Sequence, residues 1–410
     1  MPSLKALKRQ LSKPWKDKLR VAVIAVLALM AALSVYQGIR NALTFSQDFQ
    51  WDAAKALVMR LDPYELSEDP AKAAKEPELS AFYRMFTDQG LKQQMEANQF
   101  PSLLMLLFPM TVFPPDTAKI VWCVLNLAFT AGIIILVRKT FFENVPDYDQ
   151  IVIFLLMLAG TPYRNQLGVG QHTLFSFFFF MLAVYIERKR PSGDAKSMLL
   201  TALCLFVSYF KYTLTAPLAL YFLYKRRYWE IALSVAGHVL LTAVAARYLG
   251  KSFIYMIKAP LAVASHLASQ GGMDLGVILP GVWAYAAAAV LCAALIYMAL
   301  RMPEGREGIL FPVLILWSLV LVYHRIYDYF VIVCVAAVFY TDFGVLFGKT
   351  REKVMKAWYA VLVADLFFLM RLFGEGTAST VFAAVLYYTF TITLTYFAFR
   401  TIPVVNDGRE

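Results

Sequence analysis

Twelve apolar runs, several of them shorter than 20 residues, recur along this chain and are separated by polar connections. A helix needs about 20 mostly apolar residues to cross the hydrocarbon core of a bilayer. Candidate runs lie at residues 21–40, 117–137, 149–162, 172–187, 197–210, 213–224, 230–248, 275–300, 308–323, 329–347, 357–371 and 378–399. We therefore expect an all-α polytopic integral membrane protein of about twelve transmembrane helices, forming a single membrane domain over residues 1–410.

Composition agrees with a membrane protein and excludes two other classes. Hydrophobic residues make up 60% of the chain and charged residues 16%, whereas a soluble domain has about 25% charged residues. These values exclude a soluble globular chain and a disordered one. The net charge of +11 comes from short clusters between apolar runs rather than from one soluble face, so no nucleic-acid partner is expected.

Two kinds of residue inside the apolar runs are interpreted as packing residues. The four cysteines (Cys123, Cys204, Cys292 and Cys334) lie far apart in these runs. They are typical of small hydrophobic side chains, not of disulfides or a zinc site. The aromatic run Phe177–Phe180 is expected to face lipid, with a substrate prenyl chain as the alternative.

Clusters of lysine and arginine predict the orientation. Residues 1–20 form a basic tail, and further basic clusters occur at residues 138–139, 188–190, 225–227 and 349–356. Short loops rich in Lys and Arg remain in the cytoplasm. We therefore expect a multi-pass protein of the cell inner (plasma) membrane with both termini cytoplasmic.

Residues 100–115 form an apolar segment that is not expected to cross the membrane. The segment contains Pro109, ends in Pro114-Pro115 and is shorter than the roughly 20 residues of a span. That length suits an interfacial or re-entrant helix on the outer surface. A crossing here would also place every later basic cluster outside.

The first extracytoplasmic loop, residues 41–99, is the longest polar stretch. It is acidic and has helical periodicity, with a helix start after Asp48 and a stop with a turn at Leu61-Asp62-Pro63-Tyr64. Long loops in compact proteins are usually functional. We therefore expect this loop to supply helices of a catalytic site.

Polar residues from five separate regions gather at the outer helix ends in this orientation. They are Asp48, Arg164, Asn165, Gln166, Gln171, His172, Lys211, Tyr212, His324, Arg325, Tyr327 and Asp328. Polar side chains at membrane depth are costly and tend to mark substrate paths. The outer side is therefore the predicted working face.

Structural roles explain some of these residues equally well. Asp48 could cap a helix, Lys211 could snorkel toward water, and the amides could cap backbone groups in a kinked connection. The cluster of His324, Arg325 and Asp328 is harder to explain in this way, because three ionisable groups in five residues lie between two apolar runs. Asp365 lies within an apolar run and is either functional or paired with a neighbouring helix.

This set of residues suits transfer of a sugar from a lipid phosphate. Lys211, Arg164 and Arg325, with His324 or His172, could neutralise the leaving phosphate, and Asp48 could act as base on an acceptor hydroxyl. A single displacement would invert the anomeric carbon. The sequence has no P-loop and no GxGxxG after a strand, so a soluble nucleotide-sugar donor is not indicated. Asp48 and Asp52 alone are a weak metal signal, so no metal or other cofactor is expected.

Several short stretches, taken in order, resemble glycosyltransferase family 87. They are Gln47-Asp48-Phe49 with Asp62-Pro63-Tyr64, Asn98-Gln99-Phe100-Pro101-Ser102-Leu103 with Phe113-Pro114-Pro115, Arg164 to His172, Phe210-Lys211-Tyr212-Thr213 with Arg226-Arg227-Tyr228-Trp229, and His324-Arg325-Ile326-Tyr327-Asp328. No single stretch is specific to this family, but the order in which the five stretches occur along the chain is specific to it. The chain departs from the family pattern at Gln99-Phe100-Pro101-Ser102, which has one proline, and at Thr173, where the family often has Asn. These departures would indicate a different sugar or acceptor.

The resemblance implies a C-type glycosyltransferase fold and a polyprenyl-phosphate-mannose-dependent mannosyltransferase acting on the outer side of the membrane. It implies that Asp48 is the general base and that Gln171 and His324 line the donor pocket. The residues expected to bind the donor are Lys211, His324, Arg325, Asp328, Arg164, Asn165, Gln171 and His172. Those expected at the acceptor or in its loop are Asp52, Tyr64, Asn98 and Gln99. The expected partners are a polyprenyl-phosphate-linked sugar, a glycolipid or glycan acceptor, and membrane lipids.

Two other functions remain open from the residues alone. A transporter or flippase of a lipid-linked glycan would share the number of spans and the intramembrane ions. The chain shows no inverted repeat and no pair of broken spans in corresponding halves, which argues against that reading. A non-catalytic scaffold would tolerate changes at Asp48, Lys211 and His324.

Overall fold

The computed structural model describes residues 4–46, 48–68, 97–189, 194–268, 272–279, 281–341, 343–370 and 377–403. Its helices are α1 (Leu4–Thr44), α2 (Trp51–Val58), α3 (Pro63–Glu68), α6 (Pro101–Leu104), η1 (Met105–Val112), α7 (Pro115–Thr140), α8 (Asp147–Ala159), α9 (Thr161–Gly168), α10 (Thr173–Lys189), α11 (Ala195–Ser208), η2 (Tyr209–Lys211), α12 (Tyr212–Leu218), α13 (Leu220–Tyr224), α14 (Tyr228–Leu249), α15 (Phe253–Ala268), α16 (Leu275–Ile278), α17 (Val282–Arg301), α18 (Glu307–Leu321), η3 (Ile326–Tyr340), α19 (Phe343–Phe347), α20 (Lys349–Ala364), η4 (Asp365–Leu369) and α22 (Thr377–Phe399). The described residues contain no β-strand, which confirms the all-α prediction.

Several helices are long and apolar enough to span a membrane. Within the described part of the chain there are six, or seven if the bent pair α9–α10 is one broken span. The six lie at Asp17–Thr44, Pro115–Thr140, Ala195–Leu218, Tyr228–Leu249, Val282–Arg301 and Ala378–Phe399. The chain is therefore a multi-pass membrane protein, while helix length and hydropathy do not establish the expected total of about twelve.

The segment from α11 to α12 bends sharply at η2. Thr215 donates its hydroxyl proton toward the carbonyls of Ser208, at 2.9 Å, and Lys211, at 3.1 Å. Residues seven apart in a straight α-helix would be separated by about 10 Å along the axis. The returning chain then reaches Arg227, which pairs with Glu187 near the end of α10 at 3.4 Å. Lys211 thus lies at the turn between two antiparallel segments. This turn coincides with the gap between the apolar runs 197–210 and 213–224 expected from the sequence.

The helix η3 is a 3₁₀-helix of 15 residues in the centre of the bundle. Its side chains from Tyr327 to Phe339 are all buried, as expected for a helix that is apolar on every face. A 3₁₀-helix rises about 2.0 Å per residue, so η3 is about 30 Å long. That length matches the hydrocarbon thickness of a bilayer. An α-helix with the same number of residues would be shorter, because its rise per residue is smaller.

The aromatic residues of α10 correct one expectation. Phe177 and Phe180 have no exposed surface, so the prediction that the run Phe177–Phe180 faces lipid is wrong for these two residues. Phe180 lies in a nearly parallel stack with Phe311 of α18, with ring centroids 6.1 Å apart. The reason is that α10 is a central helix packed between α7 and α11.

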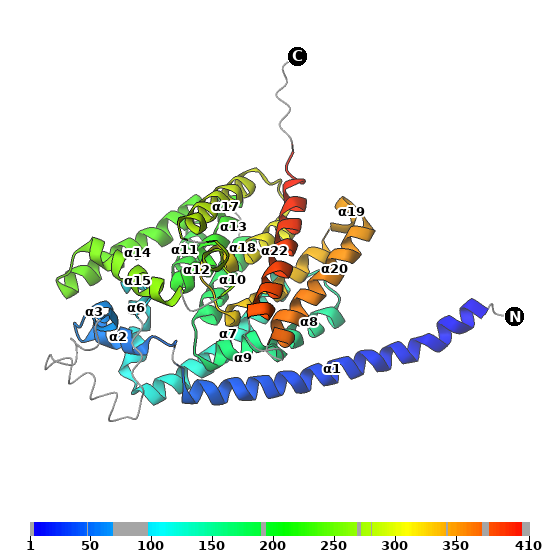
Figure 1. Cartoon of the computed structure of the whole chain (residues 1–410), viewed down its shortest axis with the longest axis horizontal. Coiled ribbons are helices and arrows are strands. Elements are labelled where there is room, and N and C mark those ends of the chain that lie inside the picture. The colour runs from blue at the N-terminus through cyan, green and yellow to red at the C-terminus, as the bar shows by residue number, and fades with distance from the viewer. Residues whose placement is uncertain are drawn as a thin grey trace, which may run out of the picture.

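The short helices between α1 and α7 gather beside the end of α1 (Figure 1). The Trp51 indole donates to the carbonyl of Met110 at 3.0 Å, which joins α2 to η1. The Tyr255 hydroxyl donates to Asp62 at 2.7 Å, which joins α15 to the start of α3. Residues 101–112 form one short apolar helical segment, and its position on the outer surface stays a prediction.

Helix α1 approaches α9 closely at Gly38. A Cβ atom at this position would lie 3.0 Å from the Leu167 side chain and 3.2 Å from the Arg164 carbonyl oxygen. Small residues allow membrane helices to approach in this way. Since α9 leads directly into the turn that carries Gln171, this contact supports the site described below.

We expect Gly38→Leu to lower the thermal unfolding midpoint of the detergent-solubilised protein. Overpacking a close helix contact costs about 1–3 kcal/mol. Ala32→Leu, on an exposed part of α1, is the matched control and should leave the midpoint unchanged. An unchanged midpoint for Gly38→Leu would show that α1 and α9 separate without cost.

Candidate active site

The segment between α1 and α2 docks against the turn that follows α9. The backbone N–H of Asp48 donates to the Val169 carbonyl at 2.9 Å. Ser46 and Gln50, on either side of Asp48, have φ angles of 40° and 60°, an unfavourable backbone region for residues other than glycine. Gly170 has φ +68°, and a Cβ atom there would lie 3.0 Å from the Ser46 hydroxyl oxygen. The N-cap residue of α2 is Gln50 rather than Asp48.

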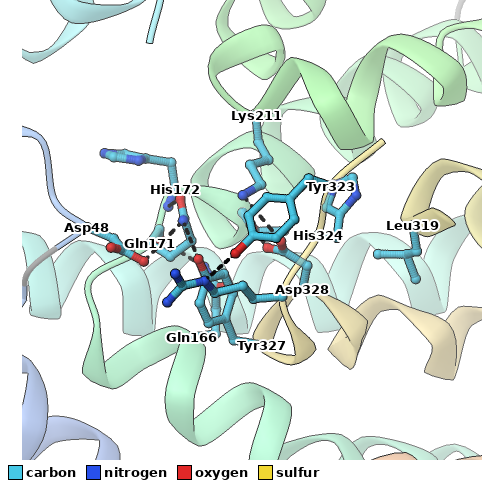
Figure 2. A network of polar contacts seen from close by, with 12 residues as sticks. Asp48, Gln166, Gln171, His172, Lys211, Leu319, Tyr323, His324, Tyr327 and Asp328 are labelled. Carbon is cyan, nitrogen blue, oxygen red and sulfur yellow. Dashed lines mark hydrogen bonds and ion pairs between the residues drawn. The ribbon is translucent and has the colours of Figure 1, made fainter. Parts of the chain in front are cut away.

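Gln171 joins three chain segments at this turn (Figure 2). Its Nε2 donates to Asp48 Oδ2 at 3.3 Å and to the Tyr327 hydroxyl oxygen at 3.1 Å. Its Oε1 accepts the backbone N–H of His172 at 2.8 Å. Its carbonyl oxygen accepts from Gln166 Nε2 at 2.9 Å. Both the main chain and the side chain of Gln171 are therefore fixed, with its amide donor aimed at the Asp48 carboxylate.

His172 contacts the turn that carries Gln171 from the side that faces the core of the bundle. Its Nε2 lies 2.8 Å from the Phe49 carbonyl oxygen, and its ring stacks on Phe210 with centroids 4.2 Å apart. The nearby Trp122 indole donates to the Gly170 carbonyl at 2.8 Å. His172 has no exposed surface. Its contacts therefore fasten the segment after Asp48 to the core of the bundle.

Lys211 and Asp328 form an ion pair of 3.2 Å across the site. The Asp328 side chain has no exposed surface, and that of Lys211 is 12% exposed. Thr173 donates its hydroxyl proton to the other carboxylate oxygen of Asp328. The Lys211 ammonium also lies 5.8 Å from the centre of the Tyr327 ring. In Figure 2 the Lys211 side chain points toward Asp328, while Asp48 lies at the other side of Gln171, so two carboxylates flank the network.

His324 lies in the connection between α18 and η3 and is only 1% exposed. Its Nδ1 is 3.0 Å from the Val322 carbonyl oxygen. Burial lowers the pKa of His324 to about 4; Lys211 adds to this effect and Asp328 opposes it. The imidazole is therefore neutral at pH 7. It can offer hydrogen bonds but does not supply the cationic charge suggested for it above.

The two expected arginines occupy different surroundings. Arg325 donates through Nε to the Tyr323 hydroxyl oxygen at 2.6 Å and lies beside the network. Arg164 donates to Gln37 on α1 at 3.3 Å and to its neighbour Asn165 at 3.1 Å. Arg325 is therefore the arginine nearer the Lys211–Asp328 ion pair. Arg164 instead contacts α1 and its own neighbour Asn165.

The residues assigned to the acceptor lie in a second group around α2, α3 and α6. The Tyr64 hydroxyl donates to the Gln99 carbonyl at 2.7 Å, and Gln99 Nε2 donates to Asn98 at 3.3 Å. Asp52 accepts the N–H of Ala53 at 2.9 Å in the first turn of α2. Burial, reinforced by Asp62, raises the pKa of Tyr64 well above its usual value, so its phenol stays protonated.

Sequence reasoning did not assign roles to three residues that hold the network together. Tyr327 lies inside the quoted His324–Asp328 stretch, and Thr173 was noted only as a departure from the family pattern. Trp122 lies within an apolar run and gave no polar signal. Among the described residues, no group of three or more His, Cys, Asp or Glu side chains could hold a metal ion.

Removing one partner of the Lys211–Asp328 pair should destabilise the fold. A buried charge left without its partner costs about 3–5 kcal/mol. We expect Lys211→Met to lower the thermal unfolding midpoint, and Lys211→Met combined with Asp328→Asn to recover much of the loss. Lys119→Met is the control, because Lys119 pairs at 3.9 Å with an exposed Asp116. Equal midpoints for the Lys211 single and double variants would contradict the pairing.

The geometry described above can be compared with known protein families. The sequence profile of glycosyltransferase family 87 matches residues 101–323, more than half of the 410-residue chain. No curated protein and no solved structure gives a significant match. The matched range contains α7 to α18, the Gln171 turn and Lys211, while Asp48 and Asp328 lie outside it. The chain therefore belongs to glycosyltransferase family 87 and is a membrane glycosyltransferase.

Proposed function

We propose that this protein transfers a sugar, mannose by family resemblance, from a polyprenyl-phosphate donor to a hydroxyl of a lipid-linked or glycan acceptor. The observation that carries the proposal is the network joining Asp48, Gln171, Tyr327, Asp328 and Lys211. It places a carboxylate at one side of the site and a cation at the other. A displacement at an anomeric carbon requires this separation of base and leaving-group charge.

In the proposed reaction the acceptor oxygen forms a bond to the anomeric carbon as its proton passes to the Asp48 carboxylate. The bond from that carbon to the phosphate oxygen breaks, and its electron pair leaves with the polyprenyl phosphate. Lys211 and Arg325 stabilise the charge that develops on the phosphate. Gln171 holds the Asp48 carboxylate in place through its 3.3 Å hydrogen bond. Attack from the face opposite the phosphate inverts the configuration.

An apolar groove beside Lys211 supports a lipid-linked donor. The groove has a volume of about 370 Å³ and is lined by residues of α6, η2, α12, α14 and α15. Tyr209 and Tyr212, which flank Lys211 in the sequence, belong to its wall. Val235 and Val239 of α14 also line it and are 47% and 52% exposed. Since α14 is a candidate span, we infer that the groove opens toward lipid, and Tyr212 in its wall adjoins in sequence the cation expected at the phosphate.

The remaining parts of the proposal follow from the family and from charge placement. We infer a C-type glycosyltransferase fold with about twelve spans and both termini in the cytoplasm of a plasma membrane. The site then faces the extracytoplasmic side, because the basic clusters lie at the opposite helix ends. The group formed by Asp52, Tyr64, Asn98 and Gln99 lies on the acceptor side. Neutral His324 and the pair Arg164–Asn165 are assigned to donor recognition.

Asp48→Asn should abolish most of the transfer without unfolding the protein. Loss of a general base lowers the rate by about 10²–10⁴-fold. The assay uses purified protein in nanodiscs with polyprenyl-phosphate-mannose and a panel of lipid and oligosaccharide acceptors. Asp116→Asn is the control, because its carboxylate is 73% exposed at the start of α7. Full activity of folded Asp48→Asn would remove Asp48 from the mechanism.

A bulky residue in the groove should weaken binding of the donor's lipid chain rather than binding of its sugar. We expect Val239→Trp to raise KM for a long-chain donor more than for a short-chain analogue, because the indole would fill space used by the distal isoprene units. Leu240→Trp is the control, since Leu240 is 65% exposed and does not line the groove. Equal KM changes for both donors would exclude the groove as the chain site.

A further inference from the structure

A polar pocket lies at the end of the bundle opposite to the Asp48 network. It has a volume of about 290 Å³ and lies where the end of α10, the start of α11 and the start of α14 meet. Helix α10 begins in the network at Thr173, which donates to Asp328, and reaches the pocket at Glu187. An α-helix rises about 21 Å over that stretch. The pocket is therefore separate from the proposed catalytic site.

This pocket lies at the level of a membrane interface. The starts of α11 and α14 are also the starts of two candidate spans, and the ends of a spanning helix lie where lipid headgroups meet water. Trp229 lines the pocket and is 71% exposed, as is common for indoles at this boundary. Leu233 follows one helical turn later on the same face of α14 and is 41% exposed. Apolar surface thus continues from the pocket along a candidate span.

Charges of both signs line the pocket. The charged residues of its wall are two arginines and three carboxylates: Glu187, Asp194, Arg226, Arg227 and Glu230. Arg227 pairs with Glu187 at 3.4 Å, and Asp194 accepts two backbone N–H groups as the N-cap of α11. Within the described part of the chain, neither Arg226 nor Glu230 forms an ion pair. One cation and one carboxylate therefore remain for a ligand.

Glu230 is the less expected of these two groups. Its side chain is only 7% exposed, and a buried carboxylate usually has a cation beside it. The helix dipole at the start of α14 offsets part of the cost, because Glu230 lies in the first turn. The dipole supplies no counter-charge, however, and the carboxylate lines the pocket. A ligand that brings an ammonium group into the pocket would supply that charge.

The same lining argues against two simpler ligands. Among the described residues, no group of three or more His, Cys, Asp or Glu side chains could hold a metal ion. A purely anionic headgroup would bring a like charge beside Glu230 and Asp194. A ligand with both a phosphodiester and a primary ammonium matches both signs, since guanidinium groups donate to phosphate and ammonium groups donate to carboxylates.

We propose that this pocket binds the headgroup of phosphatidylethanolamine from the membrane leaflet at the basic helix ends. Arg226 donates to the phosphodiester, and the ethanolamine ammonium donates to the Glu230 carboxylate. The acyl chains lie along the face of α14 that carries Trp229 and Leu233. The bound lipid ties the starts of α11 and α14 together, so it stabilises the folded protein. This binding does not depend on sugar transfer.

Lipid titrations of the purified full-length protein in detergent test the proposal. Phosphatidylethanolamine, phosphatidylcholine and phosphatidylglycerol with the same acyl chains are added, and the thermal unfolding midpoint is measured. We expect phosphatidylethanolamine to give half of its maximal upward shift at a concentration about tenfold lower than the other two lipids. The trimethylammonium of phosphatidylcholine has no N–H to donate, and phosphatidylglycerol carries no cation.

Two variants test the contacts. Glu230→Gln and Arg226→Gln should each raise the half-saturating concentration of phosphatidylethanolamine about tenfold or more, because hydrogen bonds to charged groups contribute free energy of that size. The midpoint without lipid should not fall in Glu230→Gln, since the variant removes a buried charge that has no cation beside it. Arg226 is exposed, so Arg226→Gln tests the pocket even if Glu230→Gln unfolds.

Arg138→Gln and Asp147→Asn are the matched controls. These two residues form an ion pair that is 62% and 79% exposed, and neither lines the pocket. They lie at the same end of the bundle, because Arg188 near the end of α10 lies 5.7 Å from the Phe141 ring at the end of α7. Both controls should bind phosphatidylethanolamine as wild type does.

Three results would overturn the proposal. The first is an equal response to phosphatidylethanolamine and phosphatidylglycerol, which indicates a site for any phosphate. The second is unchanged phosphatidylethanolamine binding in both folded pocket variants. The third is an equal shift with water-soluble glycerophosphoethanolamine at the same concentration, which assigns the pocket to a soluble ligand. None of these measurements uses sugar transfer, so the outcome is independent of the proposed function.

Discussion

A carboxylate without exposed surface, that of Asp328, organises the centre of this protein. Such a charge is tolerated in a low-dielectric interior only when it is paired and hydrogen-bonded. Lys211 supplies the charge and Thr173 a hydroxyl proton. The pair requires η3 to begin beside the turn at η2 and beside the first residue of α10. Three segments far apart in the sequence are therefore held in one arrangement by a single buried group.

The same arrangement explains how Asp48 is held at the end of a long helix. The residues on either side of it, Ser46 and Gln50, adopt left-handed backbone angles, which are costly for side chains with a Cβ atom. The cost is offset by hydrogen bonds from this segment to Val169 and from Gln171. A carboxylate fixed in this way needs little reorganisation, which suits the role of base proposed for Asp48. Preorganisation of this kind is a large source of catalytic rate.

Sequence reasoning predicted the helical class, the membrane location and which polar residues would gather. Asp48, Gln171, Lys211 and Asp328 do lie in one network, as expected for polar residues at apolar helix ends, and their roles stay predictions. It was wrong about Phe177 and Phe180, since a fully apolar helix looks the same whether lipid or protein surrounds it.

Other features left no separate signal in the sequence. The 3₁₀ geometry of η3 is set by tertiary packing, and an apolar run does not distinguish it from a short α-helix. The neutral state of His324 follows from burial, which composition alone does not report.

The charged groups at the two ends of the bundle differ in how they are bonded, and this difference distinguishes an anchor from a site. At the basic ends, Arg227 pairs with Glu187 and Lys225 with Glu307, each joining neighbouring helix ends. Such pairs between neighbouring helix ends suit residues whose task is to fix orientation in the membrane. At the other end, Asp48, Gln171, Tyr327, Asp328 and Lys211 are linked across four segments, so a change at one group is felt by the next. Coupled groups of both charges suit the lipid-linked donor proposed above, which has a charged head and a long apolar tail.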